Sequence, residues 1–177
     1  MDKIIYFNND NQRKDYCVGQ TYCDFLDYAF KRTDYFMLVY ANYYGKGYTK
    51  IMKHYRKALQ PFEVKNRSNA SWPGTLEQFC QSSTYKVIFY QNNEKAKEIL
   101  KTVSGISEWT CPSHTQDLAF FKGNICWSYS VGHEKIAAII HATKEDLEYV
   151  EKLGLASKEN AYTQKNNYFD AYNEQIE

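Results

Sequence analysis

The sequence predicts an α+β fold: a single domain over residues 1–177, with a mixed or antiparallel-leaning sheet, a C-terminal β-hairpin and helices packed on the sheet. Short runs of β-branched and aromatic residues alternate with segments of helical periodicity. A Gly123-Asn124 dipeptide between two strand-like runs is typical of a hairpin turn. The length suits one domain, because a chain of this size can bury roughly 70% of its unfolded surface. No internal repeat or linker divides it.

The first third of the chain contains two predicted strand–helix pairs. Lys3–Phe7 is an apolar run typical of an opening strand, and the three- and four-residue spacing of apolar side chains over Asp15–Arg32 predicts a helix. Tyr35–Tyr40 has the composition of a buried strand. Thr49–Gln60 is predicted as a second helix, which ends because Pro61 cannot continue the hydrogen-bond ladder.

The middle of the chain is predicted to hold a loop followed by a strand–helix unit. Lys65–Thr75 is rich in Asn, Ser, Pro and Gly and is interpreted as a long mobile loop, and Thr75–Gln81 as a short helix. Tyr85–Tyr90 is a strand-like run, and Asn93–Val103 is amphipathic and ends before a glycine.

The hairpin is predicted over Asp117–Lys122 and Ile125–Val131. Strict alternation along the second strand would place Ile125, Trp127, Tyr129 and Val131 on one face and Cys126, Ser128 and Ser130 on the other. An aromatic residue at such an alternating position is typical of a core, so Trp127 is assigned to the core and not to a binding site.

The C-terminal part is predicted to add one strand and one helix. Ile136–His141 could extend the sheet. Thr143, with Asp146 three residues later, predicts an N-capped helix that ends at Gly154. Residues 155–177 are polar and are interpreted as a candidate flexible acidic tail.

Composition limits the class of protein. The net charge is only +1, so no global field favours DNA or an anionic membrane as the partner. The five cysteines are an odd number without framework spacing, which predicts free thiols in a reducing compartment. The N-terminus lacks the pattern of a signal peptide, and the longest apolar run is far too short to span a bilayer. These features predict a cytoplasmic protein with no membrane contact.

Charge is unevenly distributed along the chain. Between Asn42 and Arg67 the net charge is +6, from Lys46, Lys50, Lys53, Arg56, Lys57, Lys65 and Arg67 against Glu63 alone. Between Lys144 and Glu177 the net charge is −4. The molecule is therefore expected to have a basic middle and an acidic end.

Within the basic segment, aromatic and cationic residues interleave in a way that suits a binding surface. Cations meet phosphates or carboxylates, and exposed rings stack on bases or fill apolar notches on a protein partner. The alternative is that the lysines are only the solvated face of an amphipathic helix. The predicted binding residues are Tyr43, Tyr44, Lys46, Tyr48, Lys50, Lys53, His54, Arg56 and Lys57.

The known catalytic motifs give little support for an enzyme. The chain has no Gly-x-Gly-x-x-Gly, phosphate-binding loop, Gly-x-Ser-x-Gly or zinc-protease motif, and no cofactor or metal site is predicted. The alternative hypothesis is a small cysteine- and histidine-dependent hydrolase or zinc protein in the 111–134 region. It would use Cys111, His114, Cys126, His133 and Glu134.

Three segments together resemble an uncharacterised family of small bacterial proteins: Tyr85–Gln91, Asp117–Phe121 and Trp127–Glu134. Some members of that family carry a transferred label as a stage III sporulation protein, a component that would need a membrane anchor. The resemblance covers roughly the second half of the chain and implies no mechanism. At the level of class alone, the chain is similar to phage anti-defence proteins, including anti-CRISPR proteins that bind Cas9.

The leading hypothesis is a non-catalytic binding or inhibitory protein. It would dock its basic and aromatic residues on an acidic or nucleic-acid-bearing partner, such as a Cas9-like nucleoprotein that exposes phosphate-rich guide RNA. A structural subunit of a larger bacterial assembly is a third possibility.

Overall fold

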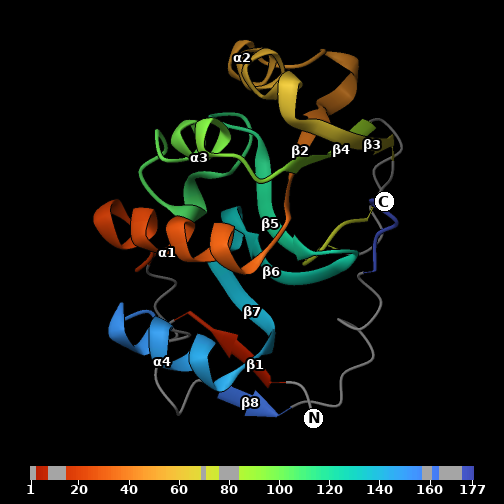
Figure 1. Ribbon diagram of the computed structural model, residues 1–177. Coiled ribbons are helices and arrows are strands. Elements are labelled where there is room, and N and C mark those ends of the chain that lie inside the picture. Colours follow the sequence, from red (N-terminus) through yellow and green to blue (C-terminus); the bar gives the residue numbers. More distant parts are fainter. Residues whose placement is uncertain (1–2, 8–14, 69–70, 76–83, 157–160, 164–172) are drawn as a thin grey trace.

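The computed structural model describes residues 3–7, 15–68, 71–75, 84–156, 161–163 and 173–177 (Figure 1). The described strands form one eight-stranded sheet in the order β3-β4-β2-β5-β6-β7-β1-β8, and each pair of neighbours is antiparallel. The strands are β1 (Lys3–Tyr6), β2 (Tyr35–Asn42), β3 (Glu63–Ser68), β4 (Thr84–Gln91), β5 (Gln116–Lys122), β6 (Ile125–Val131), β7 (Ile136–Ala142) and β8 (Ala161–Thr163).

Four α-helices accompany the described part of the sheet: α1 (Gly19–Arg32), α2 (Lys50–Leu59), α3 (Glu94–Leu100) and α4 (Lys144–Lys152). Figure 1 shows α1 and α3 beside the middle of the sheet, with α2 and α4 at opposite ends of the molecule. The predicted α+β class with an antiparallel sheet is confirmed.

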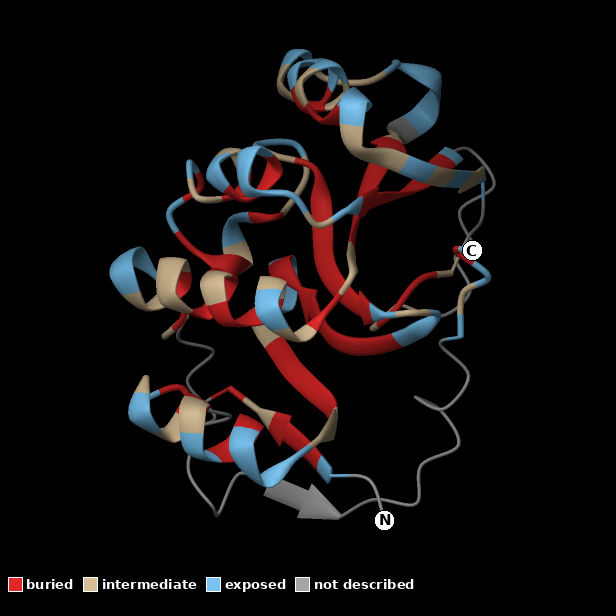
Figure 2. Cartoon of the chain, viewed as in Figure 1, coloured by how far each residue is buried: buried red, intermediate tan, exposed pale blue. Residues whose placement is uncertain are grey.

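The core is built around β2. It pairs with β4 along its whole length, from Tyr35 opposite Gln91 to Asn42 opposite Thr84, and with β5 on its other side. All six residues from 36 to 41 are buried, which Figure 2 shows as a red band through the sheet. Since successive side chains of a strand point to opposite faces, β2 is covered on both.

Helix α1 supplies much of the cover on one face. Phe25 contacts Phe120 of β5 edge-on, with 6.1 Å between ring centroids, and lies parallel to the Trp127 ring of β6. The buried Tyr22 hydroxyl donates a hydrogen bond to the Leu100 carbonyl oxygen and accepts one from the Trp109 indole nitrogen. This polar pair satisfies both rings within the core and ties α1 to the end of α3.

The structure corrects two local predictions. The Lys65–Thr75 segment is not a loop throughout, because β3 runs from Glu63 to Ser68 as an edge strand. The sequence of β3 is polar and charged, so it lacks the apolar alternation by which strands are predicted. Charged side chains are common on edge strands, where they discourage further pairing. The predicted helix over Thr75–Gln81 lies, apart from Thr75, outside the described residues.

The alternation predicted for the second hairpin strand is also wrong. Ile125 is 49% exposed, while the six residues after it in β6 are all buried. The reason is a β-bulge: Phe120 pairs with Ser128 and Phe121 with Cys126, so Trp127 is an extra, unpaired residue. A bulge shifts the two-residue period and turns the side chains on either side of it.

Parts of the predicted acidic tail contact the rest of the protein. Residues 161–163 form β8 beside β1. The Ile176 side chain is buried, and its backbone nitrogen donates a hydrogen bond to the Asn124 side chain. Glu174 forms ion pairs with Arg67 and Lys65 of β3. The last described residues therefore lie against the sheet.

Helix α4 begins with the predicted cap, and its Asp146 also holds α1. Thr143 and Asp146 form a capping box, and the Asp146 carboxylate is fully buried. Asp146 accepts a hydrogen bond of 2.8 Å from the Tyr28 hydroxyl and forms an ion pair of 3.1 Å with Arg32. One carboxylate thus joins the N-terminus of α4 to the last turns of α1.

We expect Asp146→Ala to lower the free energy of unfolding by about 3 kcal/mol, because it removes the cap and leaves Arg32 and Tyr28 without their buried partner. The matched control is Glu145→Ala, whose side chain is 70% exposed and also faces Arg32. Its cost should stay below about 0.5 kcal/mol. Urea denaturation of both variants measures the difference, and equal losses would contradict the role given to Asp146.

Candidate functional site

The predicted binding residues begin in a turn that follows β2. The turn is closed by a hydrogen bond of 2.7 Å from the Gly47 nitrogen to the Asn42 side chain. Tyr44 has left-handed backbone angles (φ 53°, ψ 31°) and is 67% exposed. A left-handed conformation is unfavourable for a residue with a Cβ. This turn therefore holds a large aromatic ring in solvent at some conformational cost, next to the exposed Lys46.

Helix α2 follows and separates its faces as predicted. The Thr49 hydroxyl caps the helix by accepting a hydrogen bond from the Met52 nitrogen. Met52, Tyr55 and Leu59 are buried against the domain. The opposite face exposes Lys50, Lys53, His54 and Lys57.

The beginning of α2 is positive for two reasons. Free backbone N–H groups give the N-terminus of a helix a partial positive charge, which normally favours acidic side chains there. The first turn of α2 contains none, and Lys50 is its first residue. Like-signed side chains at this end cost about 0.3–1 kcal/mol of helix stability and leave a site that attracts anions.

Three of the predicted binding residues have other surroundings. The Arg56 guanidinium pairs with Glu63 and lies over the Tyr40 ring, so it serves packing within the domain. Tyr48 is half-buried, edge-on to Tyr40. The side chain of Tyr43 lies outside the described part of the structure. The exposed group that remains, which we call the basic surface, consists of Tyr44, Lys46, Lys50, Lys53, His54 and Lys57.

The lysines of the basic surface differ from the other cations of the basic segment. Within the described residues, Lys46, Lys50, Lys53 and Lys57 form no ion pair, whereas Lys65 and Arg67 of β3 are paired with Glu174. The exposed acidic side chains of α4 lie at the far end of the molecule (Figure 1). The surface charge of α2 is therefore not neutralised by the described part of the chain.

The structure gives the cysteines of the hydrolase hypothesis no activating surroundings, and its described residues do not gather into a metal site. Cys126 is buried, and desolvation raises the pKa of its thiol far above the ordinary value. Burial also raises the pKa of Cys111. His133 and Glu134 are neighbours with 3.6 Å between them, and both side chains are about half exposed. The described residues contain no group of three or more His, Cys, Asp or Glu that could hold a metal ion.

The same region contains a residue that sequence reasoning did not single out, Asp117. Its carboxylate is fully buried and accepts hydrogen bonds from the Trp72 indole nitrogen (2.7 Å) and the Gly132 backbone nitrogen (3.0 Å). It is the extra residue of a bulge in β5 and has a left-handed φ of 47°. Burial raises the pKa of this carboxyl to about 6, although both hydrogen bonds and nearby His133 oppose that rise.

We expect Asp117 to make stability depend on pH. Because its pKa is higher in the folded state than the ordinary value of about 3.9, the folded state binds the proton more tightly, and stability falls as pH rises from about 4 through about 6. The loss is about 3 kcal/mol by pH 7. Asp117→Asn removes the titrating group, so the stability difference between the two proteins should change by about 2 kcal/mol between pH 4 and pH 7 in urea denaturation, because the unfolded carboxyl is already half ionised at pH 4. Parallel pH profiles would contradict it.

No helix in the described part of the chain is both long and apolar enough to cross a membrane. A comparison of the chain with protein-family models finds no match, and comparisons with curated proteins and with solved structures find none either. Function is therefore inferred from the side chains of this chain alone.

Proposed function

We propose that this protein is a non-catalytic binding protein whose basic surface docks on a phosphate-bearing or acidic partner. The observation that carries the proposal is the set of exposed lysines on one face of α2 that no described carboxylate neutralises. On most protein surfaces lysines lie among acidic side chains, which reduce the local positive potential. Here the positive potential of α2 is available to an anionic partner.

Two further features favour a partner that carries nucleic acid. Backbone N–H groups at the start of α2 add to the attraction of the lysines for phosphate. Tyr44 offers an exposed ring beside them, and base–aromatic stacking contributes about 1–3 kcal/mol per base. A nucleoprotein with exposed guide RNA, of the Cas9-like kind, combines phosphates and unpaired bases in one surface. We therefore propose that this protein acts as an anti-CRISPR-type inhibitor of such a complex.

The lysines are tested by charge reversal. We expect Lys50→Glu, Lys53→Glu and Lys57→Glu together to abolish binding to a labelled single-stranded RNA, because three phosphate contacts become repulsive. Replacing the same lysines by glutamine should weaken the dependence of log affinity on log salt concentration by about 2. Fluorescence anisotropy over a salt series measures both effects.

The matched control for the charge reversal is the triple variant Lys31→Glu, Lys95→Glu and Lys152→Glu. These lysines are also exposed and unpaired among the described residues, and they lie on other helices. This variant has the same net charge as the first. Equal loss of binding in both would show that only net charge matters, and binding to polyglutamate but not to RNA would assign the surface to an acidic protein instead.

Tyr44 is tested separately. Tyr44→Asn keeps a residue that tolerates the left-handed conformation but removes the ring. We expect it to weaken RNA binding by about tenfold without lowering the melting temperature, because the ring is in solvent and asparagine tolerates the left-handed conformation. Unchanged affinity would exclude stacking by Tyr44.

A further inference from the structure

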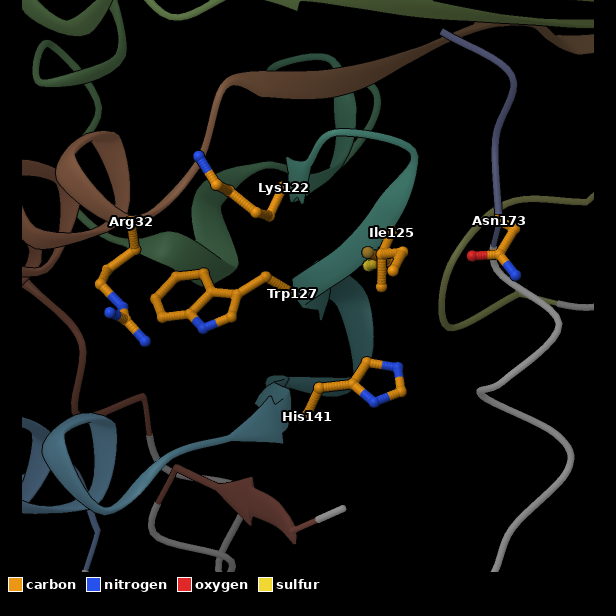
Figure 3. Close-up of a pocket in the computed structure, with 7 residues that line it drawn as sticks. Arg32, Lys122, Ile125, Trp127, His141 and Asn173 are labelled. Carbon is orange, nitrogen blue, oxygen red and sulfur yellow. The ribbon is translucent and has the colours of Figure 1, made fainter. Parts of the chain in front are cut away.

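A second region of the molecule, beside the β5–β6 hairpin in the middle of the strand order, contains a cavity of about 650 Å³. It opens where β6 and β7 diverge: their pairing starts at Ser128 opposite Ile139 and is absent for the residues beyond, at the start of β6 and the end of β7. The described lining residues are Arg32, Lys122, Ile125, Cys126, Trp127, His141 and Asn173 (Figure 3).

Two backbone irregularities create this opening. Trp127 is the unpaired residue of the bulge between β5 and β6. On β7, the register with β1 shifts between the pairs Ile139–Ile5 and Ala142–Lys3, and His141, which lies inside this irregularity, has a left-handed φ of 55°. Bulges bend a strand and redirect its side chains, and they are frequent beside binding and active sites. Strain at a residue with a Cβ persists where the surroundings hold it and often marks a functional site.

The polar groups that line the cavity include three hydrogen-bond donors. The Trp127 indole nitrogen is buried and has no hydrogen-bond partner among the described residues, in a side chain only 5% exposed. By contrast, the indole nitrogens of Trp72 and Trp109 both donate hydrogen bonds. A buried indole N–H nearly always finds an acceptor, so the missing one points to a group that binds here.

Arg32 and Lys122 supply the other donors, and each is held in place by a carboxylate that does not itself line the cavity. Lys122 pairs with Asp34 at 2.9 Å, which uses one of its three N–H groups. Arg32 pairs with Asp146, and its Nε makes an ion-pair contact without hydrogen-bond geometry. In Figure 3 the Arg32 guanidinium and the Trp127 ring point toward one another. None of the described lining residues is acidic.

We propose that this cavity binds a small organic acid with an apolar, aromatic body. The carboxylate would accept hydrogen bonds from Lys122 and from Arg32 or the Trp127 N–H, and the body would contact the carbon surfaces of Ile125 and Trp127 in a wall that is mostly apolar. The volume lies within the range of about 300–1,000 Å³ that is usual for small-molecule sites. This site is separate from the basic surface on α2.

The three tryptophans provide the test. In a proton–nitrogen correlation spectrum of the full-length protein each indole N–H gives one signal, and the Trp127→Phe variant identifies the signal of Trp127. We expect naphthoate to shift that signal with a Kd of about 0.1–1 mM, while the signals of Trp72 and Trp109 stay in place because both are already hydrogen-bonded. Naphthamide, which lacks the charge, should bind at least about tenfold more weakly.

Two lysine variants complete the design. Lys122→Gln, at a side chain that is 66% exposed, should fold normally and weaken naphthoate binding by about tenfold. Lys50→Gln, on the basic surface, is the matched control and should bind as wild type does. An unmoved Trp127 signal at about 10 mM naphthoate, equal shifts with naphthamide, or wild-type affinity of Lys122→Gln would overturn the proposal. RNA binding is a separate readout, so failure here leaves the function of α2 untouched.

Discussion

The burial of β2 on both faces is the constraint on which the rest of the structure depends. A strand without a solvent face needs neighbours on both sides for its backbone groups and cover on both faces for its side chains. β4 and β5 pair with it, α1 packs on one face, and rings such as Phe89 and Phe121 meet on the other, 5.4 Å apart. The basic turn at the end of β2 is therefore attached to a strand that is paired on both sides and buried on both faces, which suits a docking surface.

Three residues with unusual surroundings lie at irregular points of an otherwise regular sheet. Asp117, Trp127 and His141 each lie at a shift in strand register, and two of them have left-handed backbone angles. At each bulge a side chain leaves the two-residue period and is aimed where a regular strand could not place it. The bulge in β5 thus buries the Asp117 carboxylate near the start of that strand. The bulge in β6 buries the Trp127 indole N–H, which has no hydrogen-bond partner among the described residues, beside a cavity.

Charge is neutralised selectively across the molecule. The C-terminal residues return to the sheet, where Glu174 pairs with both cations of β3. Arg32 pairs with Asp146, and Lys97 and Lys101 both pair with Asp27. Among the described residues the lysines of α2 are left without such partners. Ion pairs that link distant segments hold the fold, while unpaired cations gathered on one helix create a local field that can steer a charged partner.

Local sequence patterns determined several of the secondary-structure elements of this protein. Helix α2 and its two faces follow from the spacing of its apolar residues, α4 from Thr143 and Asp146, and the hairpin from Gly123-Asn124. β3 was not predicted because its sequence is polar, and only its pairing with β4 identifies it as a strand. Arg56 and Lys57 are adjacent in sequence, yet one packs on Tyr40 and the other is in solvent. The bulges at Asp117 and Trp127 arise from the register between strands, and the cavity from their divergence. Only the tertiary structure decides such features, because contacts between residues far apart in the chain leave no periodic signal in the sequence.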